Sequence, residues 1–155
     1  MTPRRPLLLL VGGVSVLVSA YVHYYLYFKG GYRNIAPDSF AGLTISRTFA
    51  INAVAGLLIA WALVVSLRFP KLAIPAALAG VGFAAATLAA YVLTRTVGLL
   101  GFEDNQLIGE AVVAFVAEVI ALGALGSWLA GALTTARPVR ANVGPGGVEP
   151  PSDGL

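Results

Sequence analysis

The chain has 155 residues, of which 58% are hydrophobic and only 11% are charged. Soluble domains carry about 25% charged residues, and a chain this short could not bury so much apolar surface in water. The composition therefore excludes a soluble globular domain and indicates lipid as the solvent. The net charge of +3 comes from basic residues at the ends of apolar runs, a pattern typical of topology signals and not of a nucleic-acid surface. Because the chain has no cysteine, disulfides, thiol catalysis and thiolate metal sites are excluded.

The first apolar segment, Leu7–Phe28, predicts a transmembrane helix. At the rise of an α-helix its 22 residues span about 33 Å, enough to cross the hydrocarbon core. Arg4 and Arg5 followed by Val18-Ser19-Ala20 also resemble a signal peptide with a small-residue cleavage site. We expect an uncleaved helix, because the apolar run continues past Ala20 to Phe28.

Three more apolar segments predict helices over about residues 47–67, 72–93 and 108–133. We therefore expect an all-α fold, a polytopic four-transmembrane-helix bundle over residues 1–133. Residues 134–155 are rich in Pro and Gly and cannot form a packed core, so we expect a disordered cytoplasmic tail.

Glycine and other small residues predict how the bundle turns and closes. Gly30-Gly31 favours the end of the first helix, since paired glycines disfavour helix. The tight Arg68-Phe69-Pro70-Lys71 connection makes the second and third helices antiparallel neighbours. The spacing of Ala76, Gly80 and Ala84 places small residues on one face, where a neighbouring backbone can approach closely.

The basic residues predict the orientation. One side of the membrane would hold Arg4, Arg5, Arg68, Lys71, Arg137 and Arg140, and the other Lys29, Arg33, Arg47 and Arg95. Because cytoplasmic loops carry the excess of Lys and Arg, we expect both termini in the cytoplasm and the protein in the cell (plasma) membrane.

Glu118 is the clearest functional candidate among the polar residues of the predicted helices. A charge at the centre of a bilayer costs about 2.5–3.5 kcal/mol on insertion scales and is a functional hypothesis by default. Glu118 lies roughly 15 Å into the fourth helix by helical rise, and Glu110 lies two turns nearer the helix start. We expect Glu118 to be either a protonated acid or half of an ion pair.

Partners for Glu118 are expected in the same outer half of the bundle. His23 and Tyr27 lie in the aromatic cluster at the end of the first helix, Arg47 and Asn52 open the second, and Arg95 closes the third. The predicted polar intramembrane site is therefore His23, Tyr27, Arg47, Asn52, Arg95, Glu110 and Glu118. The structural alternative is that the arginines reach the headgroups and that Glu118 and His23 hold helices together by hydrogen bonds.

Catalytic and metal motifs are absent from the sequence. The chain has one histidine, which cannot ligate a haem from both faces without a dimer, and it lacks HxxxH, ExxH and CxxC spacings. It also lacks a P-loop, a GxGxxG loop in the required context and a nucleophile elbow. We therefore predict no catalytic residue and no metal ligand, and we do not expect an enzyme.

Several motifs resemble a known group of proteins. They are His23-x-x-x-Tyr27-x-x-Gly30-Gly31-Tyr32-Arg33-x-Ile35, Asn52-Ala53-x-Ala55-Gly56, Gly98-Leu99-Leu100-Gly101-Phe102-Glu103 and Val116-x-Glu118. Over about residues 7–132 the chain resembles small, uncharacterised four-helix integral membrane proteins of actinobacterial type. The resemblance implies the fold and the membrane location, and it brings no catalytic residues.

Two functions remain open. The first is a structural or accessory subunit of a larger membrane complex, which an exposed Gly/Ala stripe on one outer face would favour. The alternative is a small-ligand, haem, quinone or proton-coupled binding or transport protein. A closed cavity between the first, second and fourth helices, reached from outside, would favour it. The expected partners are the lipid bilayer and a membrane protein or a second copy of the chain, and not nucleic acid.

Overall fold

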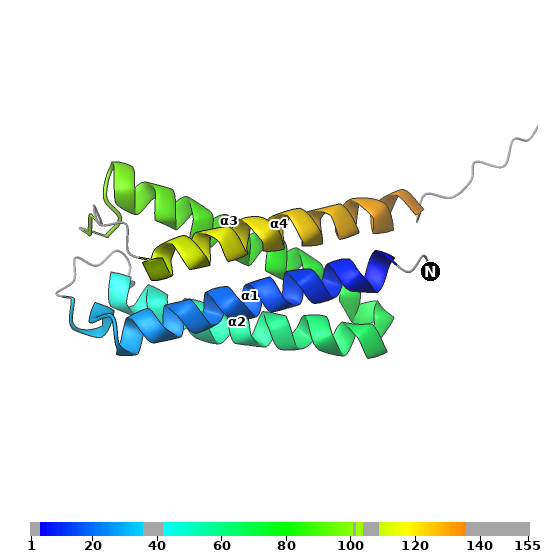
Figure 1. Ribbon diagram of the computed structural model, residues 1–155, viewed down its shortest axis with the longest axis horizontal. Helices are drawn as coiled ribbons and strands as arrows, with labels where there is room; N and C mark the ends of the chain where they lie inside the picture. Colours follow the sequence, from blue (N-terminus) through cyan, green and yellow to red (C-terminus); the bar gives the residue numbers. More distant parts are fainter. Residues whose placement is uncertain (1–3, 36–41, 101, 104–108, 136–155) are drawn as a thin grey trace, which may run out of the picture.

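Four long helices make up most of the protein. The computed structural model describes residues 4–35, 42–100, 102–103 and 109–135 (Figure 1). The long helices are α1 (Arg4–Phe28), α2 (Ile45–Arg68), α3 (Ala73–Thr96) and α4 (Gly109–Thr135), and two short 3-10 helices are η1 (Tyr32–Asn34) and η2 (Pro70–Leu72). The described residues contain no β-strand, so the predicted all-α, four-helix fold is confirmed. Most of the predicted tail, from residue 136 on, lies outside the described residues.

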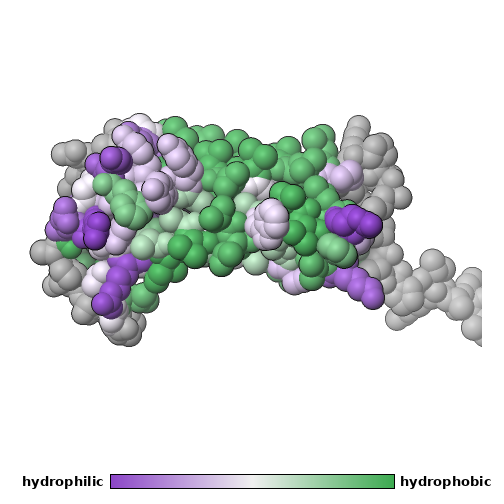
Figure 2. Space-filling view, turned by 90° about the horizontal axis from the view of Figure 1, so that it is seen from below, coloured by the Kyte–Doolittle hydropathy of each residue, from purple (hydrophilic) through white to green (hydrophobic). Residues whose placement is uncertain are grey.

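All four helices can cross a membrane. Their apolar spans run from 23 to 27 residues. Figure 2 shows apolar side chains over the middle of one face and polar residues gathered toward both ends. Large apolar side chains of α2 such as Val54, Leu58 and Trp61 are exposed, as expected where a helix faces lipid and not water. The protein is therefore a multi-pass membrane protein.

The helices form a closed ring with up-down topology. α1 packs along α2 and α4, and α3 completes the ring by packing against α2 and α4. The start of α1, η2 and the end of α4 lie at one end of the bundle, which we call the terminal end (Figure 1). η1, the end of α3 and the start of α4 lie at the other, which we call the η1 end.

The terminal half of the bundle is packed by apolar side chains around Leu125. Leu125 is fully buried, and so are Leu63 and Val16. A methyl group built on Gly12 of α1 or on Gly80 of α3 would clash with the Leu125 side chain, so both glycines provide the space that this leucine fills. Gly80 belongs to the predicted small-residue face, and its neighbours Ala76 and Ala84 are also buried, which confirms that this face is an interface.

Glycine also determines how the chain turns at the η1 end. α1 ends at Phe28, and Gly31 has φ +84°, a left-handed conformation that glycine adopts without strain, so the predicted role of the glycine pair is confirmed. The turn leads into η1, where Tyr32 is buried against the bundle. The turn at Gly31 therefore places the ring of Tyr32 against the η1 ends of α1 and α2.

We predict that Gly12→Ala destabilises the bundle by about 1–3 kcal/mol, the usual range for overpacking. The new methyl group would overlap Leu125 near its branch point, where the side chain cannot move away easily. Gly123→Ala in α4 is the control, because nothing lies within 4 Å of the added group there. Unfolding in detergent measures both variants, and equal stability of Gly12→Ala and Gly123→Ala would contradict the proposed contact.

Candidate functional site: a polar cavity at the η1 end

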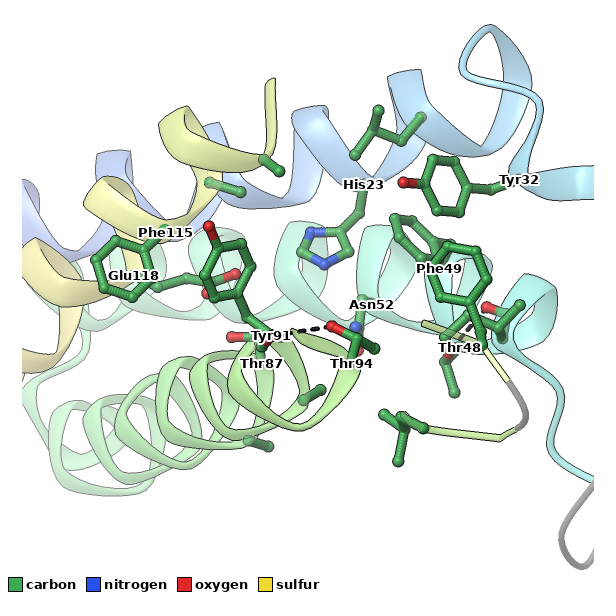
Figure 3. A pocket seen from close by; sticks show the side chains of 18 residues that line it. His23, Tyr32, Thr48, Phe49, Asn52, Thr87, Tyr91, Thr94, Phe115 and Glu118 are labelled. Carbon is green, nitrogen blue, oxygen red and sulfur yellow. Dashed lines mark hydrogen bonds between the residues drawn. The ribbon is translucent and has the colours of Figure 1, made fainter. Parts of the chain in front are cut away.

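A cavity of about 270 Å³ lies between the four helices at the η1 end (Figure 3). Its polar lining residues come from every long helix and are His23, Thr48, Asn52, Thr87, Thr94 and Glu118. Its aromatic lining residues are Tyr32, Phe49, Tyr91, Phe102 and Phe115. The remaining wall is made of Ala, Leu and Ile side chains. The cavity is therefore a mixed polar and aromatic site inside a bundle whose outer surface is apolar.

Glu118 is the buried acid of this site. Its side chain is only 3% exposed, and the hydroxyl of Ser19, which is fully buried, donates a hydrogen bond of 2.7 Å to Oε1. Thr87 of α3 lies beside the same carboxyl group. Because Ser19 belongs to α1 and Glu118 to α4, this hydrogen bond joins two helices at the inner limit of the cavity.

His23 lies one helical turn after Ser19 and shares its surroundings. Its Nδ1 lies 2.9 Å from the backbone oxygen of Ser19 and 3.4 Å from the Ser19 hydroxyl. A carbonyl oxygen can only accept, so Nδ1 donates this hydrogen bond and Nε2 carries the lone pair of the ring. The ring packs near Phe49 and Phe83, with centroids 5.4 and 6.5 Å away, and these contacts fix its orientation.

The threonines of the cavity use their hydroxyl hydrogens within their own helices. Thr87 donates to the backbone oxygens of Phe83 and Ala84 at 2.9 and 3.1 Å. Thr48 donates to Ile45 at 2.6 Å, and Thr94 donates to Tyr91 at 2.9 Å. A hydroxyl group has one donor and two lone pairs, so each of these oxygens retains a lone pair for another partner. The threonine hydroxyls that line the cavity are therefore hydrogen-bond acceptors.

Aromatic rings form two walls. Tyr32 packs on Phe49 and Phe102 at centroid distances of 4.3 and 5.7 Å, covering the cavity at the η1 end. Tyr91 of α3 packs on Phe115 of α4 at 5.1 Å. Both sets present π-faces or ring edges to the space in which His23 and Glu118 lie, as Figure 3 shows.

The structure brings three of the seven predicted site residues together. His23, Asn52 and Glu118 all line the cavity, from α1, α2 and α4. Tyr27 does not line it, and its ring packs instead on Phe28 at 4.9 Å. Glu110 is exposed in the first turn of α4.

The two predicted arginines also lie outside the cavity lining. Arg47 is exposed and donates to the backbone oxygen of Gly42 at 2.6 Å. The guanidinium of Arg95 lies 4.5 Å from the ring centroid of Tyr91. Arg47 extends away from the cavity, as long side chains near helix ends often do, and half-buried Arg95 packs on Tyr91, so neither arginine is the partner of Glu118 that the sequence led us to expect. Ser19 takes that place.

Several residues of the cavity were missed by the sequence reasoning. Ser19 was considered only as part of a possible cleavage site, although Ser19 and His23 are four residues apart and so share a helix face. Thr87, Tyr91 and Thr94 follow the same helical spacing on α3. Polar residues repeated at this spacing inside an apolar helix were the signal that could have identified this wall.

No protein-family model, curated protein or solved structure matches the chain. The resemblance to small actinobacterial-type membrane proteins therefore stays a prediction. The function has to be argued from the cavity itself.

We predict that Glu118→Gln leaves the stability close to that of the wild type and that Glu118→Leu lowers it by about 1–2 kcal/mol, the scale of an interhelical hydrogen bond in a membrane. The amide oxygen of Gln can still accept from Ser19, whereas Leu leaves a buried donor unpaired. Thermal unfolding in detergent distinguishes the variants. Equal stability of the wild type, Gln and Leu forms would show that no hydrogen bond joins α1 and α4 at Glu118.

Proposed function

We propose that the protein is a plasma-membrane protein that binds a small ligand in the cavity at the η1 end. The observation that carries this proposal is the convergence of Glu118, His23 and Asn52 on one cavity within a lipid-facing bundle. Polar groups at membrane depth are costly and most often belong to ligand or ion sites. A mainly apolar cavity with a few convergent polar groups is also the usual form of a small-molecule site.

The size of the cavity limits the ligand. Drug-sized ligands occupy pockets of about 300–1,000 Å³, and a cavity of about 150 Å³ is enough to hold benzene. The cavity, at about 270 Å³, lies between these values. This favours a substituted benzene or a molecule of similar size over a haem.

The packing of the terminal half of the bundle favours a binding site over an open channel through the membrane. Leu63, Leu125 and Val16 are fully buried at the centre of that half, next to the inner limit of the cavity. Passage from the cavity to the terminal end is therefore closed in this conformation. Transport would require these apolar side chains to separate.

Ala90→Phe should abolish ligand binding, because Ala90 lines the cavity and a phenyl ring would occupy it. Val92→Phe is the control, since Val92 is 51% exposed on the same helix and does not line the cavity. The probes are benzylammonium, benzyl alcohol and benzoate, which share a ring and differ in charge. Calorimetry on the purified protein in lipid nanodiscs measures binding.

Binding of at least one probe to the wild type and to Val92→Phe, with loss in Ala90→Phe, is the expected result. Absence of binding by all three probes would overturn the proposed function. Equal binding to Ala90→Phe would place the ligand outside this cavity.

The proposed orientation places the η1 end outside the cell and both termini in the cytoplasm. The excess of basic residues that the sequence predicts on the cytoplasmic side supports it. A reporter that works only in the cytoplasm should be active when it is fused after Leu155. Activity of a reporter that works only outside the cytoplasm would reverse this orientation.

A second function, docking as an accessory subunit, is favoured by one outer face of α3. Ala79, Gly82, Ala85 and Ala89 are exposed and lie on one side of the helix, where a neighbouring helix could approach closely. Gly82→Leu should then release the protein from a larger complex on native gels of its own membranes. Unchanged migration would exclude this face as the docking surface.

A further inference from the structure

We infer that the ligand is a small organic cation with N–H donors, an aromatic primary ammonium, held with its charge beside Glu118. The inference rests on the proposed function and deepens it, because it assigns a chemical class to the ligand of the same cavity. It follows from the hydrogen bonds that the lining groups can accept or donate, from the charge of Glu118 and from the aromatic wall.

The first argument is the surplus of acceptors. Thr48, Thr87 and Thr94 have donated their hydroxyl hydrogens to backbone oxygens, so each offers only lone pairs to a ligand. His23 donates through Nδ1 to the Ser19 carbonyl and retains a lone pair on Nε2. A ligand that donates several hydrogen bonds matches this lining, whereas one that only accepts does not.

The remaining donors are few. Asn52 has an amide, and Tyr32 and Tyr91 each have a hydroxyl, so all three can donate to a ligand as well as accept from it. These three groups can also accept, whereas the threonine oxygens, the imidazole nitrogen and an ionised Glu118 add acceptors only. A quinone, whose oxygens only accept, therefore fits this cavity less well than an amine.

The second argument is charge. Glu118 is 3% exposed and is the one acidic residue among those described that line the cavity, and no described lining residue is Lys or Arg. The hydroxyl of Ser19 is neutral, so no described lining residue balances an ionised Glu118. Of its two expected forms, Glu118 is therefore the neutral acid until a cation lies beside it. A ligand with a positive charge supplies this balance, whereas an anion would be repelled.

The third argument is the aromatic wall. A cation over the face of an aromatic ring gains about 0.5–2 kcal/mol, and aromatic cages are the usual sites for organic ammonium ions. Phe49 and Phe115 line the cavity that holds Glu118, and they can also stack on a ring of the ligand, whereas the Tyr91 ring already carries the Arg95 guanidinium at 4.5 Å. Within the described residues no group of three His, Asp or Glu side chains could hold a metal ion, so an organic cation fits the site better than a divalent metal.

The test compares four probes in calorimetry on the full chain in nanodiscs. They are benzylammonium, benzyltrimethylammonium, benzyl alcohol and benzoate. We expect benzylammonium to bind at least tenfold more tightly than benzyl alcohol, benzyltrimethylammonium to be intermediate because it has charge without N–H donors, and benzoate not to bind. Glu118→Gln should weaken benzylammonium at least tenfold and change benzyl alcohol little.

Thr94→Val provides a second variant that tests the acceptors separately from the charge, since the Thr87 oxygen already lies beside the Glu118 carboxyl group. It retains the shape of the side chain and removes the oxygen, so it should weaken benzylammonium severalfold and leave benzyltrimethylammonium unchanged. Thermal unfolding of each variant verifies that it is folded. A loss of affinity for both cations in Thr94→Val would contradict the role of its lone pair.

The outcomes separate this inference from the proposed function. Tighter binding of benzyl alcohol or benzoate than of benzylammonium would overturn the cation and retain the small-ligand site. Displacement of benzylammonium by equimolar potassium would assign the site to an inorganic cation and overturn the organic one. Absence of binding by all probes would overturn both proposals.

Discussion

The hydrogen bond from Ser19 to Glu118 lies at the boundary between the packed half of the bundle and the cavity. It joins α1 to α4 at 2.7 Å, and both residues are buried. On its terminal side the helices are close enough for Leu125 to fill the space beside Gly12 and Gly80. On its η1 side, larger aromatic residues and threonines line an open space. Without a partner on α1, the carboxyl group of Glu118 would have to be buried with one interaction fewer, at a cost that apolar packing does not offset.

The two halves of the bundle follow from the side chains at their interfaces. Small residues such as Gly80, Ala84 and Ala121 allow the backbones of α3 and α4 to approach other helices in the terminal half. Near the η1 end, Tyr91 and Phe115 occupy corresponding positions on these helices. Aromatic rings hold the backbones farther apart than alanine does. The cavity is therefore a consequence of side-chain size along the same two helices, and Tyr32 covers its end because Gly31 allows the chain to turn back.

The four helices could be predicted because an apolar run of about 20 residues has few alternatives in a bilayer. Glu118, His23 and Asn52 could be singled out for a similar reason. A polar side chain inside the bilayer is costly, so it usually belongs to a functional site. The partner of Glu118 could not be predicted. The aliphatic part of an arginine side chain is long, so the positions of Arg47 and Arg95 in the sequence do not determine where their guanidinium groups lie. Hydroxyl residues are difficult for the opposite reason. Serine and threonine can bond to their own helix at little cost, as Thr87 does, so neither Ser19 nor Thr87 stands out in an apolar run.

The protonation of His23 is the most direct test of the acceptor-lined cavity, and it can be measured without assignment because the chain has one histidine. Nitrogen-15 magnetic resonance of the labelled protein in lipid distinguishes a ring nitrogen that carries hydrogen from one that does not. We expect hydrogen on Nδ1, bound to the Ser19 carbonyl, and a lone pair on Nε2 whose resonance moves when benzylammonium is added. Hydrogen on Nε2, in the free or the bound protein, would make His23 a donor to the ligand and would contradict a cavity built to receive a cation.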